Sequence, residues 1–127
     1  MNEINIKPLE ILTHWQQNLN EGNLSGVLRL YDLSCVLIPT FSSDILTDHE
    51  QIKEYFVNVI EVQKGSVQFQ QNSISQHPIG KNMFLLCGIY FFNLMEKGEI
   101  PARFSFLISP FLENPIKHHH SSRSISN

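Results

Sequence analysis

The sequence predicts an α+β domain in which three helices pack on a curved antiparallel sheet, giving a cone. In the first half of the chain, apolar residues recur every three to four positions, which is typical of amphipathic helices. After Gly65 the apolar period changes to two, which is typical of strands. Because the helices come first and consecutive strands follow, an arrangement with the helices on one face of the sheet is favoured.

The first half contains the three predicted helices and one strand. One apolar stripe begins after Pro8 and consists of Leu9, Leu12, Trp15 and Leu19. The helical region extends to about residue 33 and is interrupted at residues 20–23, where a glycine can end a helix. A short strand is expected over residues 35–40. The third helix should begin at Thr47 or Asp48, with Thr47 and Glu50 as a capping box, and should end at residues 64–65.

The second half is expected to form an antiparallel meander. The predicted strands are residues 66–76, 83–95, 103–109 and 116–122. A turn should occupy residues 78–82 and a hairpin turn residues 96–99. The whole chain, residues 1–127, is expected to be one domain, with residues 121–127 polar enough to fray.

Composition excludes several classes of function. The net charge is −3, and no basic patch with interleaved aromatic residues indicates nucleic-acid binding. The N-terminal residues lack the pattern of a secretory signal, and the longest apolar run is about half the length needed to span a membrane. We therefore expect a cytoplasmic protein with no membrane partner. Cys35 and Cys87 lie in apolar surroundings and are expected to be reduced core residues.

The two faces of the central hairpin are predicted from its turn. If Lys97-Gly98 is a two-residue loop, Phe92 lies opposite Arg103 and Tyr90 lies opposite Ser105. One face then carries the polar groups, on Gly88, Tyr90, Phe92, Arg103 and Ser105. The other face is apolar and consists of Cys87, Ile89, Phe91, Phe104 and Phe106.

Neither face of this hairpin is polar throughout, as a solvated sheet face should be. The helices can cover only one of them. We therefore expect the face with Ile89, Phe91, Phe104 and Phe106 to pack against a second subunit, giving a homodimer or larger homo-oligomer. The alternative is that the helices or the tail cover the Phe104 face and that water covers the Arg103 face.

Several short segments resemble one known superfamily in their order and spacing. They are Trp15 with Leu19, Gly22-Asn23 with Val27, Leu30-Tyr31, residues 36–40, Ile52 with Tyr55-Phe56, residues 88–92, residues 102–106 and residues 119–122. In this the chain resembles the NTF2-like superfamily. More narrowly, it resembles the bacterial SnoaL-like and SgcJ/EcaC-type proteins and the calcium/calmodulin-dependent kinase II association domain. It departs from them at residues 112–115, which replace an Asp-Gly-x-Trp turn, and at Arg123-Ser124, which replaces Met-Pro.

The resemblance implies a cone-shaped fold, a dimer or larger ring built through the sheet, and a deep pocket between helices and sheet. It implies no single function, because the superfamily contains isomerases, dehydratases, hydrolases, polyketide-cyclising enzymes and non-catalytic association domains. Function must therefore be argued from the site.

Arg103 is the main candidate for ligand binding. A guanidinium among aromatic residues is always charged and offers two parallel donors to a carboxylate or phosphate. The alternative is a structural ion pair with Asp32 or Glu54. The expected ligand is a small anionic or carboxylate molecule, and no cofactor is implied.

The remaining candidate site residues are aromatic, histidine and serine side chains. The ligand-binding set is Arg103, Tyr90, Ser105, His118, His120, Tyr31, Tyr55 and Trp15. His118 and His120 should point to one side of a strand, but no third protein ligand is evident, so we predict no metal site. The predicted function is an oligomeric small-molecule-binding protein. The alternatives are a pure association domain, or an acid–base enzyme (an isomerase, dehydratase or SgcJ-like oxidoreductase-associated protein) with His120 and Tyr90 as catalytic residues.

Overall fold

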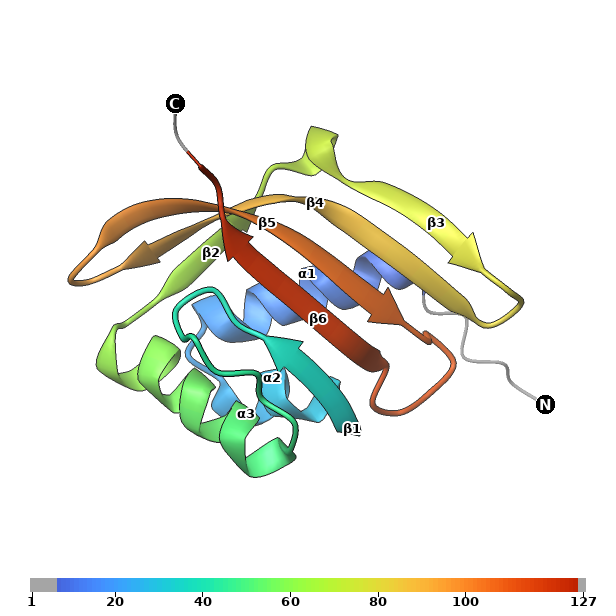
Figure 1. The fold of residues 1–127 in the computed structure, drawn as a ribbon, viewed down its shortest axis with the longest axis horizontal. Coiled ribbons are helices and arrows are strands. Elements are labelled where there is room, and N and C mark those ends of the chain that lie inside the picture. The colour runs from blue at the N-terminus through green and yellow to red at the C-terminus, as the bar shows by residue number, and fades with distance from the viewer. Residues whose placement is uncertain (1–6, 126–127) are drawn as a thin grey trace.

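The computed structural model describes residues 7–125 and has an α+β architecture (Figure 1). The helices are α1 (Pro8–Asn20), α2 (Leu24–Arg29) and α3 (His49–Phe56), which continues as a π-helix over Val57–Val62. The strands are β1 (Tyr31–Ile38), β2 (Ser66–Phe69), β3 (Ser75–Ile79), β4 (Met83–Leu94), β5 (Gly98–Ile108) and β6 (Ile116–Arg123). A single 3-10 turn over Gln71–Ser73 joins β2 to β3.

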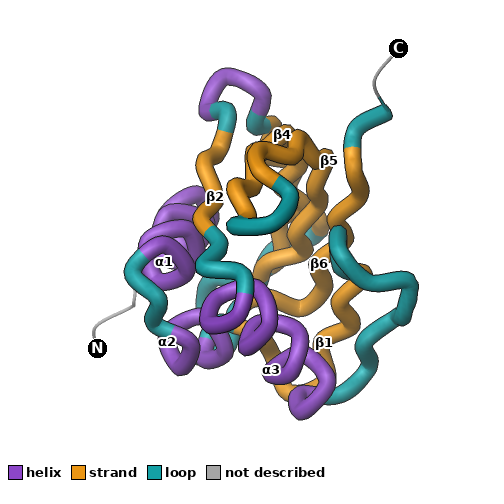
Figure 2. The backbone as a smooth tube through the Cα atoms, turned by 90° about the vertical axis from the view of Figure 1, so that its left-hand side faces the viewer, coloured by secondary structure: helices purple, strands orange, loops and turns teal. Residues whose placement is uncertain are grey.

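The strands form one curved sheet in the order β1-β6-β5-β4-β2, with β3 also paired to β4. The helices lie on its concave side, so the predicted α+β cone is confirmed (Figure 2). The sheet is mixed rather than purely antiparallel, because β1 runs parallel to β6. These strands come from opposite ends of the chain, so no hairpin forces them to be antiparallel.

The buried stripe of α1 differs from the predicted stripe by one position. Leu12, Trp15 and Leu19 are buried as expected, but Ile11 is buried in place of Leu9, whose side chain is 42% exposed. The polar side of the same helix covers an edge of the sheet. Asn20 donates to the Val67 carbonyl (2.9 Å) and accepts from the Val67 amide (2.7 Å).

The start of α3 also lies one residue further along than the predicted capping box. Asp48 is the N-cap and accepts a 2.9 Å hydrogen bond from the Gln51 amide, while the Gln51 side chain accepts from the Asp48 amide. The carboxylate of Asp48 therefore replaces the hydroxyl of Thr47 as the cap. The π-helix that follows ends at Val62, and Lys64, two residues further on, has a positive φ of 51°.

The register of the β4–β5 hairpin contradicts the predicted one. The turn contains three residues, 95–97, so Leu94 pairs with Gly98, whose φ of 68° suits glycine. Tyr90 consequently pairs with Ala102 instead of Ser105. A shift by an odd number of residues moves every side chain of one strand to the other face. Arg103 and Ser105 therefore lie on the face opposite to Tyr90 and Phe92.

The predicted strand over residues 66–76 is interrupted. Its first part, β2, pairs with residues 90–93 of β4, and its second part continues as β3, which pairs with residues 83–87. At the interruption, the Ser73 hydroxyl accepts from the Ile89 amide at 2.8 Å, next to Gly88. A side chain at residue 88 would meet Ser73 and Phe104, so glycine allows the two segments to pack closely.

The C-terminal strand β6 includes the first residues of the tail that was expected to fray. β6 extends through Arg123 and Ser121 is buried, so fraying does not begin at Ser121; the predicted tail residues 126–127 lie outside the described residues. Across residues 7–125, no helix is both long and apolar enough to cross a membrane.

Candidate functional site

The sheet separates the predicted site residues into two groups. Trp15, Tyr31 and Tyr90 point to the concave side and are fully buried. Arg103, Ser105, His118 and His120 lie on the convex side, because Arg103 pairs with Ser122, Ser105 with His120 and Leu107 with His118. Tyr55, on α3, is partly exposed beside the buried group. The two predicted catalytic residues, His120 and Tyr90, are therefore on opposite faces.

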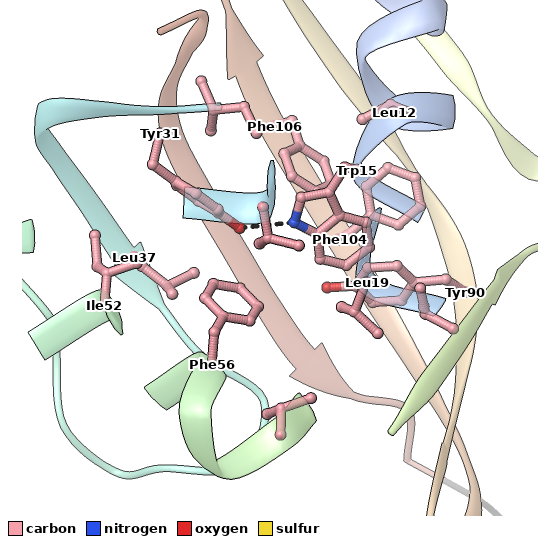
Figure 3. Close-up of a cluster of buried hydrophobic side chains, with 14 of the residues drawn as sticks. Leu12, Trp15, Leu19, Tyr31, Leu37, Ile52, Phe56, Tyr90, Phe104 and Phe106 are labelled. Carbon is pink, nitrogen blue, oxygen red and sulfur yellow. Dashed lines mark hydrogen bonds between the residues drawn. The ribbon is translucent and has the colours of Figure 1, made fainter. Parts of the chain in front are cut away.

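A chain of hydrogen bonds crosses the concave side. The Trp15 indole donates to the Tyr31 hydroxyl at 3.0 Å (Figure 3), and that hydroxyl lies 2.8 Å from Nδ1 of His119. Nε2 of His119 lies 3.0 Å from the Tyr90 hydroxyl. The Tyr90 hydroxyl donates to Ser121 at 2.6 Å, and Ser121 is also hydrogen-bonded to Thr40.

The donors and acceptors along this chain assign one tautomer to His119. Tyr90 uses its single proton on Ser121, so its oxygen accepts the proton of Nε2. Tyr31 accepts from Trp15, so its own proton points to Nδ1. His119 is therefore neutral and protonated on Nε2, and every donor in the chain from Trp15 to Ser121 has an acceptor.

Burial favours the neutral form of each titratable side chain in this row of hydrogen bonds. It lowers the pKa of His119 well below its usual value, and the neighbouring His118 and His120 lower it further. Burial also raises the pKa of Tyr31 and of Tyr90 above the usual range. The ring of His119 stacks on Phe106 with 3.8 Å between ring centroids, which leaves no polar neighbour above that face.

Side chains almost fill the space beside this row of hydrogen bonds. A cavity of about 10 Å³ lies against Tyr55, Thr40, Tyr90, His119 and Ser121, which is room for about one water molecule. The aromatic rings of Trp15, Tyr90 and Phe92 occupy the region where the resemblance implies a deep pocket. Among residues 7–125, no carboxylate lines this cavity. Tyr55 also borders an outer cleft of about 260 Å³ that contains Asp44 and Glu54.

The convex face carries a larger, open depression of about 300 Å³. It is lined by Arg103, Phe104, Ser105, His120 and Ser122. Arg103 is exposed and donates through Nη2 to the Ser122 hydroxyl at 3.3 Å. Neither predicted acidic partner pairs with it. Asp32 instead forms an ion pair with Lys117 at 3.3 Å, which is the sole ion pair among residues 7–125.

The predicted subunit contact also divides between the faces. Phe104 and Phe106 are core residues, 4% and 0% exposed, and do not belong to an outer surface. Ile89 and Phe91 lie on the convex face of β4 and are partly exposed, together with Leu85 and Cys87. This apolar strip borders the Arg103 depression, because Ile89 pairs directly with Arg103.

Three polar residues in the buried row of hydrogen bonds are not among the site residues predicted from the sequence: His119, Ser121 and Thr40. Strand alternation already placed His119 opposite to His118 and His120. Only the pairing of His119 with Phe106 and Leu37, two core residues, shows which of the two sides is interior.

The surroundings of the two cysteines keep both thiols in their protonated form. Burial raises the pKa of the Cys35 thiol to about 12 and also raises that of Cys87, so neither thiol is activated. Both are free cysteines. Within the described part of the chain, no three His, Cys, Asp or Glu side chains gather closely enough to hold a metal ion.

No protein-family model matches the chain, and no curated relative is detected from its sequence. Solved structures do resemble it. A protein from Xanthomonas campestris, assigned as a calcium/calmodulin dependent protein kinase II association domain, has 26% identity and a TM-score of 0.81, with 94% of this chain and 86% of that chain covered.

Two further structures are similar at lower sequence identity. An NTF-2 like protein from Shewanella oneidensis has 15% identity and a TM-score of 0.72, covering 90% of this chain and 94% of that chain. A protein from Novosphingobium aromaticivorans, assigned as a scytalone dehydratase, has 6% identity and a TM-score of 0.77, covering 92% and 81%. At these identities the likeness shows the fold alone. With its cone of helices and curved sheet, the chain thus has the NTF2-like fold, which is shared by dehydratases and association domains.

Proposed function

We propose that this protein binds a small anionic ligand in the depression on its convex sheet face and that it does so as a homo-oligomer. The observation that carries the first part is the exposed Arg103 guanidinium, which lines a depression of about 300 Å³ and has no acidic partner among residues 7–125. A guanidinium remains charged at any physiological pH and matches the two oxygens of a carboxylate.

The buried row of hydrogen bonds from Trp15 to Ser121 is a weaker candidate for ligand binding than the depression. Its cavity of about 10 Å³ admits nothing larger than about one water, and its hydrogen-bonding groups already satisfy one another. We also do not propose an acid–base reaction that uses His120 together with Tyr90. The two side chains lie on opposite faces of the sheet and cannot contact the same substrate.

The test is thermal unfolding in the presence of a panel of small carboxylates and other anions. A ligand at 100 times its dissociation constant should stabilise the wild-type protein by about 2.7 kcal/mol. The Arg103→Ala variant should lose this stabilisation. The Arg123→Ala variant, which removes the same charge from an exposed position on β6, should retain it. An absence of stabilisation, or equal stabilisation of Arg103→Ala, would contradict the proposal.

Self-association is a second proposed function, supported by the outer positions of β4. Leu85, Cys87, Ile89 and Phe91 are all apolar and partly exposed, whereas a solvated antiparallel face is expected to be polar. A second copy of this chain, with the same strip, is the occupant that we propose. The name of the Xanthomonas campestris structure, an association domain, agrees with this proposal.

Analytical ultracentrifugation tests the association. The wild-type protein should sediment as a dimer or larger species, and Phe91→Glu should be monomeric because a charge would be buried in the interface. Leu33→Glu is the control, since Leu33 is 73% exposed on β1, at the edge of the sheet. A monomeric wild type, or dissociation by both substitutions, would argue against an interface on β4.

A further inference from the structure

We propose that the Arg103 depression is built for a tetrahedral oxyanion, such as a phosphate group, rather than for a planar carboxylate. This inference rests on the proposed function, because it assumes that the depression binds an anion. The strand register determines the number and direction of the hydrogen-bond donors around the depression.

Four polar side chains form a square on the convex face of β5 and β6. Arg103 pairs with Ser122, and Ser105, two residues further along β5, pairs with His120. Side chains directly opposite each other on antiparallel strands are about 5 Å apart, and residues i and i+2 of one strand are about 7 Å apart. An ion at the centre of this square is therefore within reach of all four corners.

Each corner has a donor that can point toward the centre. The Ser122 oxygen accepts from Arg103, so its own hydrogen is free to donate. Across residues 7–125, the Ser105 hydroxyl and the His120 ring have no hydrogen-bond partner within the protein. Within the described part of the chain, the remaining guanidinium hydrogens of Arg103 also face no carboxylate, since none lines the depression.

This arrangement favours a tetrahedral ion for a geometric reason. A carboxylate held by the fork of Arg103 uses both of its oxygens at one corner of the square. The donors of Ser105 and His120, at the far side, would then have no acceptor. A phosphate group can place two oxygens on the guanidinium and still direct a third toward Ser105 and His120, and it carries more negative charge.

Isothermal titration calorimetry with inorganic phosphate, glycerol phosphate and acetate, at constant ionic strength, tests this inference. We expect either phosphate to bind wild-type protein at least about tenfold more tightly than acetate, because it gains hydrogen bonds to a charged acceptor. Comparison of the two phosphates distinguishes a free ion from an ester, and tight binding of either supports the inference.

Variants at single corners of the square make the test specific. Ser105→Ala should weaken phosphate binding by roughly tenfold and leave acetate binding unchanged, whereas Arg103→Lys should weaken both. Ser66→Ala, an exposed serine on β2, is the control and should change neither.

The outcomes separate the two proposals. If acetate binds as tightly as phosphate, and Ser105→Ala changes the affinity for neither anion, the tetrahedral site is overturned. The anion site at Arg103 would remain. Absence of binding by all three anions, or binding that persists in Arg103→Ala, would overturn both.

Discussion

The Nε2 atom of His119 lies 3.0 Å from the hydroxyl oxygen of Tyr90, inside the cone. Through a neutral imidazole, this contact joins β6 to β4, which lie on either side of β5 in the sheet. Both ring nitrogens of His119 are engaged with tyrosines, and the only other histidines on β6 lie on the opposite face of the sheet. The interior of this protein is thus held by polar contacts as well as by its aromatic core.

The neutral state of His119 predicts that stability falls at acidic pH. An unfolded histidine binds a proton near pH 6.5, whereas burial lowers the pKa of His119 well below that in the folded state. The unfolded state therefore binds more protons below pH 6.5. The free energy of unfolding should fall by up to about 1.4 kcal/mol for each pH unit below 6.5. Urea denaturation from pH 7.5 to 5.5 measures this slope.

Substitution of His119 identifies the source of the slope. His119→Gln should lower the stability at pH 7.5 but flatten its dependence on pH. His14→Gln, at an exposed position of α1, should retain the wild-type slope. An unchanged slope in His119→Gln would show that other groups determine the acid sensitivity.

Removal of the Tyr31 hydroxyl should be costly because two buried partners depend on it. In Tyr31→Phe the indole of Trp15 and Nδ1 of His119 both lose their hydrogen-bond partner. We expect a loss of about 1–3 kcal/mol in the free energy of unfolding, measured by chemical denaturation. Tyr55→Phe, which changes the partly exposed tyrosine of α3, should cost less. Equal losses would contradict the hydrogen bonds assigned to the Tyr31 hydroxyl.

Asn20 should protect the edge of the sheet at β2. Its side chain occupies both the amide and the carbonyl of Val67, which would otherwise lack partners on that edge. Asn20→Ala should destabilise the protein by about 1–2 kcal/mol and speed amide exchange at Val67. The exposed Thr13→Ala on the same helix should do neither, and unaltered exchange at Val67 in Asn20→Ala would count against this role.

Gly65 should tolerate no side chain because the backbone before it approaches too closely. An added Cβ would lie 2.8 Å from the Val59 carbonyl oxygen and 2.9 Å from Leu94. Gly65→Ala should cost about 1–3 kcal/mol in calorimetric unfolding. Gly80→Asn, in an open turn with a φ of 68°, is the control and should cost less, because asparagine tolerates this conformation.

The sequence predicts the element order well because helices and strands have different apolar periods. Trp15 and Leu19 follow the helical period and are buried as expected. The position of Arg103 could not be predicted in the same way. Its face depends on whether the turn before it contains two or three residues, and Gly98 suits either.

The content of the interior could not be predicted either. Strand alternation places His119 apart from its two neighbours, but only the pairing with Phe106 shows that it points inward. Whether Trp15 and Tyr90 line a pocket or fill it depends on how their rings pack, which the pattern of apolar residues does not specify.

The most direct test of the central claim, an anion site on the convex face, is a titration with phosphate followed by amide chemical shifts. The account predicts that the shifts concentrate at Arg103, Ser105, His120 and Ser122, and that Tyr31 and His119 remain unperturbed. Shifts concentrated at Tyr31, Tyr90 and His119 would instead place the ligand inside the cone and contradict the account.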